Sequence, residues 1–310
     1  MKVWALHLAV IAGLGAALFV LPPYHVTSLS RIMVLAVFAM GYNLAFGYTG
    51  LLSLGHALFF AAGVYGAALP ASYLGVSAGP AMIGGLFAGA VMAGAVGLLA
   101  LRTAGVSFMI VTLMFAQAGY LTILYFGQVT GGDEGLVLPE TVRQLAGLDL
   151  SSETARFVTA LVLFSLGLIG ALLIVQSPFG RVMVAMRENE ERSRMLGYNP
   201  FAVKLAVLAL SGAYAGLAGA AHAVLFGYAG ASFATIQYSI LPMLWVLMGG
   251  AGTVLGPLIG TALMFYIIDL AGNLTTATLL VVGVALLVLI LFAPRGILGT
   301  LRERGLRWLP

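Results

Sequence analysis

The sequence predicts an all-α, polytopic integral membrane protein. Only 8% of its 310 residues are charged and 62% are hydrophobic, with a mean hydropathy of +1.09. A soluble domain carries about 25% charged residues, so this composition cannot supply a polar surface. The long apolar runs lack the alternating pattern of a membrane β-barrel. Because backbone polar groups inside a bilayer need internal partners, helices of about 20 residues are expected.

About ten membrane segments are expected, several of them short or broken. The pair Pro22-Pro23 ends the first segment, and residues 177–180 end the sixth. Glycines between positions 249 and 252 interrupt the C-terminal apolar region. The eighth and ninth segments are therefore either two crossings or one broken helix. The expected ranges are 4–21, 29–46, 57–70, 80–101, 106–127, 157–176, 204–228, 240–251, 254–268 and 274–292.

The first segment is interpreted as a membrane helix rather than a signal peptide, because its apolar run is long and no cleavage site stands out. With both termini in the cytoplasm, eleven of the 14 basic residues lie inside. Arg31, Arg143 and Arg156 lie outside. This bias follows the positive-inside rule. The chain is expected to form a single transmembrane domain, 1–310, with a cytoplasmic loop at 177–203 and an external loop at 128–156.

Small residues recur at four-residue spacing in two segments. One stripe contains Gly85, Gly89, Ala93 and Gly97, and the other contains Ser211, Ala215, Gly219 and Ala223. Small residues let membrane helices approach closely, where lipid provides no hydrophobic drive between them. The two stripes predict a tightly packed bundle.

Several chemistries are not expected of this chain. It has no cysteine, and its four histidines are not spaced as metal ligands, so neither a metal site nor a catalytic site is predicted. The small net charge of +4 does not indicate nucleic-acid binding. No G-x-x-x-x-G-K-[ST] motif occurs, so ATP hydrolysis by that chemistry is not expected and no cofactor is predicted in this chain.

The stretch "SPFGRVMVAMRENEERSRMLGYNP", from Ser177 to Pro200, is the only long charged stretch between membrane segments. Residues 181–196 contain good helix formers without Pro or Gly, so they predict one short helix. Pro178 and Gly180 are expected to stop the helix before it. This segment is either a solvated loop or a docking helix for a cytoplasmic partner.

This stretch and the helix after it resemble the permease subunits of branched-chain amino acid ABC importers of the LivM type. The stretches "NLAFGYTGLLSLGHALFFAAGVY", "GVSFMIVTLMFAQ", "VTGGDEGL", "GGAGTVLGPLIGTAL" and "LFAPRGILG" agree with the same family. The resemblance implies four partners besides the lipid bilayer of a bacterial or archaeal inner membrane. They are a second homologous permease in a heterodimer, two cytoplasmic ATPase subunits that hydrolyse ATP, and a periplasmic or extracellular substrate-binding protein.

The resemblance also implies site residues. The cytoplasmic loop would couple to the ATPases, although Arg192 and Ser193 replace the two alanines of the importer signature that follows Glu191. The external glycine-rich turn would contact the binding protein. The implied coupling residues are Gly180, Arg181, Arg187, Glu188, Asn189, Glu191, Arg194, Leu196 and Gly197, and the binding-protein residues are Gly131, Gly132, Asp133 and Glu134.

The translocation pathway is predicted at "GYNLAFGYTGLLSLGH", where polar residues and glycines interrupt an apolar region. Residues 32–101 contain no Asp, Glu, Lys or Arg. If residues 48–60 are helical, Thr49, Ser53 and His56 share one face. Asn43 and Gly50 complete the predicted pathway set, with the break placed at Gly47. Packing between helices is the alternative explanation for these polar groups.

Other functions stay open from the sequence. Permeases for urea or short-chain amides have similar motifs, so the substrate is not fixed. An ion-coupled secondary transporter or channel would use an intramembrane acid, and Asp269 is the only charge between residues 205 and 294. A purely structural membrane subunit is disfavoured by the polar, glycine-rich interruptions.

Overall fold

The computed structural model describes residues 2–145, 147–274, 278–293 and 295–304. The predicted tenth segment, 274–292, overlaps residues 275–277, which lie outside the described residues. In chain order the helices are α1 (Lys2–Val20), α2 (Pro23–Asn43), η1 (Leu44–Tyr48), α3 (His56–Leu74), α4 (Ala78–Ala100), α5 (Val106–Tyr125), α6 (Gly127–Thr130), η2 (Glu140–Val142), α7 (Glu153–Gln176), α8 (Pro178–Glu188), α9 (Glu190–Met195), α10 (Pro200–Phe226), η3 (Ala231–Ala234), α11 (Ile236–Gly249), α12 (Gly256–Leu274), α13 (Thr278–Phe292) and α14 (Gly296–Arg304).

Within the described residues, four strands of two residues each lie between the helices. They are β1 (Leu136–Val137), β2 (Gln144–Leu145), β3 (Leu148–Asp149) and β4 (Tyr228–Ala229). Strand β1 pairs antiparallel with β4, with Leu136 opposite Ala229, and β2 pairs antiparallel with β3. The β1–β4 pair ties the segment between α5 and α7 to the end of α10.

The prediction of an all-α polytopic membrane protein is confirmed. Seven described helices, α1, α2 with η1, α3, α4, α5, α7 and α10, are long and apolar enough to cross a membrane. Three more apolar helices, α11, α12 and α13, follow. Helices α11 and α12 are two antiparallel helices rather than one broken helix, because Gly249 packs on Gly256 and Gly260 packs on the carbonyl of Trp245.

Among the helix starts, that of α2 differs most from the expectation. Helix α2 begins at Pro23 rather than near residue 29, with Pro22 in an extended conformation before it. Proline lacks the amide proton that a first-turn residue would leave unpaired, so it ends one helix and starts the next.

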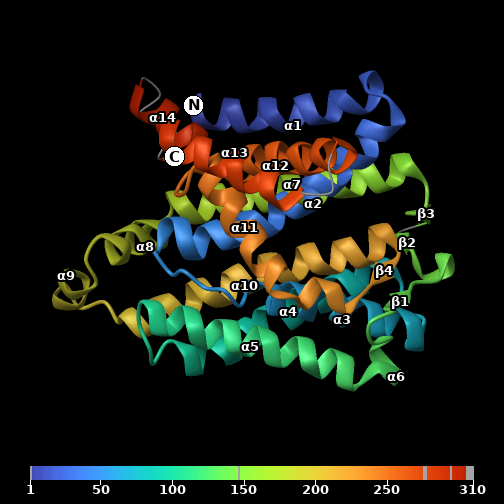
Figure 1. Ribbon diagram of the computed structural model, residues 1–310, viewed down its shortest axis with the longest axis horizontal. Helices are drawn as coiled ribbons and strands as arrows, with labels where there is room; N and C mark the ends of the chain where they lie inside the picture. Colours follow the sequence, from blue (N-terminus) through green and yellow to red (C-terminus); the bar gives the residue numbers. More distant parts are fainter. Residues whose placement is uncertain (1, 146, 275–277, 294, 305–310) are drawn as a thin grey trace.

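The bundle has two distinct ends (Figure 1). Helices α8 and α9, the start of α1 and helix α14 lie at one end, called here the α9 end. Helix α6 and the four strands lie at the opposite end, called the strand end. Most long helices run between these two ends, as a membrane-spanning bundle requires.

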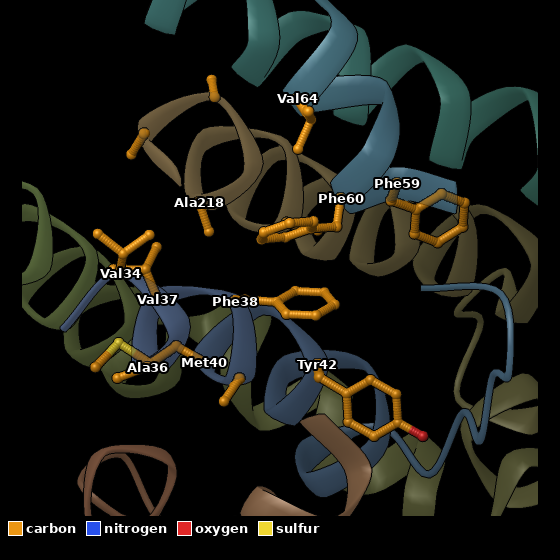
Figure 2. Close-up of a cluster of buried hydrophobic side chains, with 14 of the residues drawn as sticks. Val34, Ala36, Val37, Phe38, Met40, Tyr42, Phe59, Phe60, Val64 and Ala218 are labelled. Atoms are coloured by element: carbon orange, nitrogen blue, oxygen red, sulfur yellow. The ribbon is translucent and has the colours of Figure 1, made fainter. Parts of the chain in front are cut away.

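Helix α2 occupies the centre of the bundle and is buried along most of its length. Its Phe38 ring packs on Phe60 of α3 at 4.8 Å between centroids and on Trp245 of α11 at 6.4 Å. Figure 2 shows Phe38 facing Phe60, with Tyr42 one turn farther along α2 and Ala218 on the neighbouring α10. The aromatic rings fix α2 between the helices that carry the polar groups described below.

Glycines bring α4, α10 and α3 into backbone contact. A Cβ on Gly216 of α10 would lie 2.8 Å from the Cα of Gly89, and one on Gly89 would lie 2.6 Å from the Cα of Gly216. Gly219 packs on the Phe60 carbonyl of α3. The prediction of close packing is confirmed for the α4 stripe. On α10, Gly212 and Gly216, beside the predicted stripe, make the contact with α4.

Replacing Gly216 with Ala should destabilise the bundle by about 1–3 kcal/mol, because the added methyl meets the α4 backbone rather than a flexible side chain. Gly94→Ala on α4 is the matched control, since nothing lies within 4 Å of a Cβ there. Denaturant unfolding of the purified protein in micelles measures both. Equal stability of the two variants would contradict this packing.

Candidate functional site

The predicted pathway stretch contains a real helix break. Helix α2 ends in the π-helical turn η1, residues 49–55 are not helical, and α3 begins at His56. The expectation that Thr49, Ser53 and His56 share one helical face is therefore wrong. The hydrogen-bond pattern changes after the π-helical turn, since the Leu51 amide donates to the Ala45 carbonyl rather than to that of Gly47. The chain then continues without helical structure as far as His56.

A second break lies beside the first one, between α11 and α12. Asn43 connects the two. Its Nδ2 donates to the Thr253 carbonyl at 2.9 Å, and its Oδ1 accepts from the Gly252 amide at 2.9 Å. A Cβ on Gly47 would lie 2.6 Å from the Gly252 nitrogen, so the two backbones are in direct contact. One side-chain amide thus satisfies a donor and an acceptor that the second break leaves without helical partners.

The other predicted pathway side chains also satisfy local backbone or neighbouring helices. Thr49 Oγ1 donates to the Leu44 carbonyl at 3.0 Å, and Ser53 Oγ accepts from the Gly55 amide at 3.1 Å. His56 Nε2 lies 2.8 Å from Ser211 Oγ of α10. All three side chains are buried, as is Asn43, whereas Gly50 is exposed with φ of 77°. Within this chain the polar groups hold the break together.

The first turn of α3 is completed from two other helices. The Leu54 amide donates to Thr112 Oγ1 of α5 at 3.1 Å, and the Ala57 amide donates to Ser239 Oγ of α11 at 3.0 Å. A helix start leaves four amides unpaired, and burying them without acceptors is costly. The break is therefore connected to α2, α5, α10, α11 and the α11–α12 turn.

The charged segment after α7 forms two helices, not the single helix expected over 181–196. Ser177 caps α8, which begins at Pro178 and contains Gly180, so these residues start a helix as well as end α7. Asn189 is extended, with φ of −160°, and its side chain caps α9 by accepting from the Arg192 amide at 2.8 Å. An internal cap ends α8 and restarts the helix in a new direction. Gly197 follows α9 with φ of 91°.

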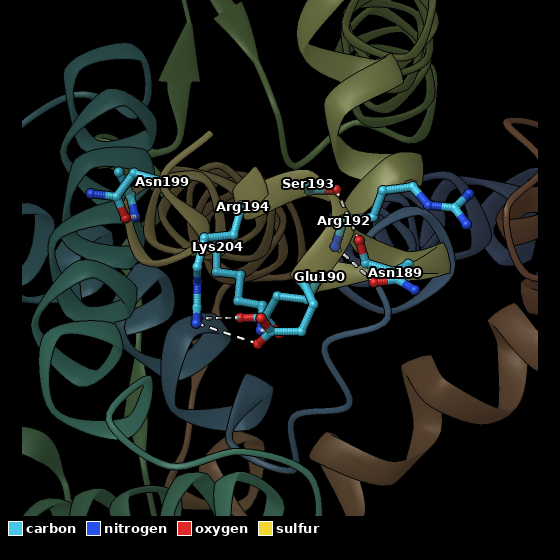
Figure 3. Close-up of polar contacts among 9 residues, drawn as sticks. Asn189, Glu190, Arg192, Ser193, Arg194, Asn199 and Lys204 are labelled. Atoms are coloured by element: carbon cyan, nitrogen blue, oxygen red, sulfur yellow. Dashed lines mark hydrogen bonds and ion pairs between the residues drawn. The ribbon is translucent and has the colours of Figure 1, made fainter. Parts of the chain in front are cut away.

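Helix α9 is anchored to the start of α10 by an ion pair (Figure 3). Lys204 Nζ lies 2.5 Å from Glu190 Oε2, and only 18% of the lysine side chain is exposed. Arg194 makes a surface pair with Glu191 at 3.3 Å. Glu190 and Lys204 were not among the predicted site residues. Opposite charges 14 positions apart give no periodic signal of such a contact.

The predicted coupling residues fall into different environments. Arg181, Glu188, Asn189, Glu191, Arg194, Leu196 and Gly197 are exposed at the α9 end, whereas Gly180 is buried. A Cβ on Gly180 would lie 2.6 Å from the Ile174 carbonyl, so this glycine permits the tight junction with α7. Arg187 is also exposed, but unlike its neighbours it reaches the first helix break, where its Nη1 donates to the Gly47 carbonyl.

Large apolar side chains are exposed on this otherwise charged segment. Met195 is 85% exposed, Leu196 is 71% exposed and Tyr198 is 46% exposed. We call these three residues the α9 patch. Apolar side chains that remain exposed beside charged ones commonly mark a protein contact. The sequence analysis identified only Leu196 of this group.

A cavity of about 500 Å³ connects the charged segment with the first helix break. Residues 49–52, the α4–α5 turn, residues 186–190 and Lys204 line it. Part of each predicted group, separated by more than 100 positions in the chain, thus lies around one space at the α9 end: Thr49 and Gly50 of the pathway set, and Arg187, Glu188 and Asn189 of the coupling set. The sequence predicted both groups but not their contact.

The predicted external loop lies at the strand end. Gly131 and Gly132 have positive φ angles of 77° and 55°, as expected for this turn. Asp133 and Glu134 are exposed, and neither carboxylate has a hydrogen bond or ion pair among the described residues. These two acids are available to a partner at this end.

Arg143 fixes the same loop to the bundle. Its guanidinium donates to the carbonyls of Val224 and Leu225, at 2.8 Å each, which end α10. Burial lowers the pKa of this guanidinium, and the nearby Arg156 lowers it further. A cation at a helix C-terminus is stabilised by the unpaired carbonyls and the helix dipole.

Asp269 lies in α12 near its end, and Tyr24 at the start of α2 donates a hydrogen bond to its Oδ2. The carboxylate is partly exposed and joins two helices at the strand end. This position agrees with the expected location near the end of the ninth segment.

Comparison with known proteins gives a consistent result. The sequence model of a permease family, described as "Branched-chain amino acid transport system / permease component", matches residues 24–293. The chain is 29% identical over 299 residues to the high-affinity branched-chain amino acid transport system permease protein LivM of Escherichia coli K12, covering 88% of this chain and 69% of that protein. It is 27% identical to LivM of Salmonella typhimurium LT2 over the same shares.

A third relative is more distant. The probable branched-chain amino acid transport permease protein LivM of Methanocaldococcus jannaschii is 26% identical over 155 residues, which cover 49% of this chain and 44% of that protein. No solved structure matches this chain.

Replacing Asn43 with Ala should lower the stability of the bundle by about 1–3 kcal/mol for each buried group left unpaired at Gly252 and Thr253. Gln237→Ala is the control, because Gln237 is exposed on the surface of α11. Unfolding in micelles measures the difference. An Asn43→Ala variant as stable as this control would show that the two breaks do not depend on the amide.

Proposed function

We propose a function for this chain on the basis of its family: it belongs to the permease components of branched-chain amino acid transport systems. It is thus a membrane-embedded transport permease of the ABC type. In our proposal it forms the translocation pathway with a second, related permease in the inner membrane of a bacterium or archaeon. Two separate ATPase subunits supply the energy, and a binding protein delivers branched-chain or related amino acids.

The α9 end faces the cytoplasm in this proposal. The charged segment 177–203, with four basic residues, lies there together with the start of α1 and with α14. The acidic segment 128–156 lies at the strand end. The distribution supports this orientation, because positive charge is retained on the cytoplasmic side of membrane proteins.

The observation that carries the proposal is the α9 patch. Met195, Leu196 and Tyr198 are exposed at the end of the molecule that the charges assign to the cytoplasm, not along the lipid-facing sides. Water contact costs about 25 cal/mol for each Å² of such surface, so a partner that covers the patch is stabilised. The rim of charged residues, including Arg194 and Glu191, gives the contact its orientation. We assign the patch to an ATPase subunit.

At the opposite end, the exposed carboxylates of Asp133 and Glu134 support contact with the binding protein. The loop that carries them is held by Arg143 and by the β1–β4 pair, so the acids are presented on a fixed backbone. Charged groups at the rim of a contact mainly set orientation and association rate.

The helix break supports the position of the pathway. Irregular backbone at membrane depth is tolerated where it is buried in protein or lines a cavity. The break meets both conditions, since Thr49, Ser53 and His56 are buried while residues 49–52 line the 500 Å³ cavity. Neutral polar groups can pass a zwitterion without the strong binding that would retain it. We infer that the buried residues become accessible during transport.

Cysteines at positions 49, 53 and 56 test this inference in a chain that has no other cysteine. We expect slow reaction with small aqueous thiol reagents at rest, because all three side chains are buried, and faster reaction during ATP-driven transport. A cysteine at Ala104, which is exposed and lines the same cavity, calibrates full reactivity. Protection of all three positions in both states would assign them to packing alone.

The ATPase contact and the function are tested together in proteoliposomes. They would contain this chain together with its second permease, its ATPases and its binding protein. We expect uptake of branched-chain amino acids that requires ATP and is insensitive to ion gradients. Leu196→Asp should reduce ATPase co-purification and uptake by about tenfold or more, since burying a charge in place of a leucine costs several kcal/mol.

Leu196→Met is the matched control, because it keeps an apolar side chain of similar size, and it should retain both activities. Uptake driven by an ion gradient without ATP would contradict the proposed function. ATP-driven uptake of urea or an amide, without uptake of branched-chain amino acids, would support the proposed mechanism and contradict the proposed substrate. Normal co-purification with Leu196→Asp would remove the α9 patch from the ATPase contact.

A further inference from the structure

Arg187 belongs to α8, yet its side chain contacts both helix breaks. Its Nη1 donates to the Gly47 carbonyl in the first break. The same atom lies 3.2 Å from the position of a Cβ on Gly252 in the second break. The Cγ of Arg187 lies 3.3 Å from the position that a Cβ on Gly50 would occupy. Glycines in both breaks therefore leave the space that the arginine side chain occupies.

The Gly47 carbonyl is available because of the π-helical turn. In a regular helix it would accept from the amide of Leu51, four residues later. That amide donates to Ala45 instead, at 2.8 Å. The guanidinium supplies the missing donor. A charged donor makes a stronger hydrogen bond than a neutral one, so this contact stabilises the break more than an ordinary polar side chain would.

The two breaks respond to Arg187 as one unit. Asn43, four residues before Gly47, bonds to both Gly252 and Thr253 of the second break. Gly47 itself is in backbone contact with Gly252. A displacement of the Gly47 carbonyl would therefore be transmitted to the α11–α12 turn through rigid, short contacts.

The geometry of α8 and α9 completes the connection. Helix α8 ends at Glu188, directly after Arg187, and Asn189 starts α9 in a new direction. The exposed α9 patch follows within nine residues of Asn189. A force applied to α9 thus reaches the C-terminal turn of α8, where Arg187 is attached, and it also reaches α10 through the ion pair between Glu190 and Lys204.

We propose that Arg187 is the positioning residue that transmits movement of α8 and α9 to the paired helix breaks at Gly47 and Gly252. This inference rests on the proposed function, in which an ATPase moves α9. The proposal assigns two different roles to residues of the charged segment. The α9 patch binds the ATPase, whereas Arg187 acts inward on the membrane helices and does not contribute to ATPase binding.

The test compares ATP hydrolysis with transport in the reconstituted complex. Arg187→Ala should leave the ATPases bound and hydrolysing ATP, while uptake per ATP falls by about tenfold, which corresponds to about 1.4 kcal/mol of lost coupling. Arg187→Lys keeps the charge and a donor and should recover part of the coupling. Arg102→Ala is the control, because this arginine is exposed at the same end of the bundle.

A second variant tests the paired breaks and guards against simple misfolding. If Arg187 and Asn43 act through the same paired breaks, their effects should not add. The double variant Arg187→Ala, Asn43→Ala should then take up about as much substrate per ATP as the more impaired of the two single variants. Independent, multiplying losses would overturn the proposal. So would unchanged coupling in Arg187→Ala, or loss of bound ATPase, which would place Arg187 in the docking contact.

These outcomes are distinct from failure of the proposed function. If the unmodified complex transports without ATP or does not hold ATPases, the function itself is wrong. If the unmodified complex couples ATP to uptake and Arg187→Ala couples equally well, only the role of Arg187 is wrong.

Discussion

The architecture depends on how the backbone is satisfied where two membrane helices are interrupted. In an apolar surrounding each unpaired amide or carbonyl is costly, so a break persists only where other groups supply partners. The Asn43 amide supplies both a donor and an acceptor to the second break. The Arg187 guanidinium supplies a donor to the first. Each break is thus stabilised by hydrogen-bond partners from its surroundings, which the other break and the charged segment supply.

Close helix packing makes this arrangement possible. Gly89, Gly216 and Gly219 bring α3, α4 and α10 close enough for backbone contact, which places Ser211 within 2.8 Å of His56. The aromatic cluster around Phe38 fixes α2 in the centre and directs its end toward the α11–α12 turn. Small residues set the distances between helices, and large ones set their rotation. The polar contacts at the breaks then need little adjustment.

Polarity differs between the two ends of the bundle and its middle. The described charged residues concentrate at the α9 end and the strand end, whereas the buried side chains of the break itself, Asn43, Thr49, Ser53 and His56, include no Asp, Glu, Lys or Arg, and the Arg187 guanidinium reaches it from α8. A permease that handles a zwitterion benefits from this separation, since a buried charge would bind the substrate tightly and slow its release. The charges instead organise loops, through contacts such as Glu190 with Lys204 and Arg143 with the end of α10.

Much of the fold follows from the sequence alone, because membrane helices are marked by long apolar runs and their ends by Pro, Gly and charge. The helix pattern, the two small-residue stripes, the interruption near Gly47 and the charged segment were all visible there. Two predictions about local geometry were wrong. Residues 49–55 are not helical, and residues 181–196 form two helices separated by Asn189.

The tertiary structure alone specified which groups meet. No local pattern connects Asn43 with Thr253, Glu190 with Lys204, or Arg187 with the Gly47 carbonyl, since these contacts span from 14 to 210 positions. The π-helical turn also depends on such a partner, because it leaves the Gly47 carbonyl without its helical donor and the Arg187 guanidinium supplies one. Periodicity records how one helix faces its surroundings, whereas the pairing of two breaks exists only once all the helices have packed.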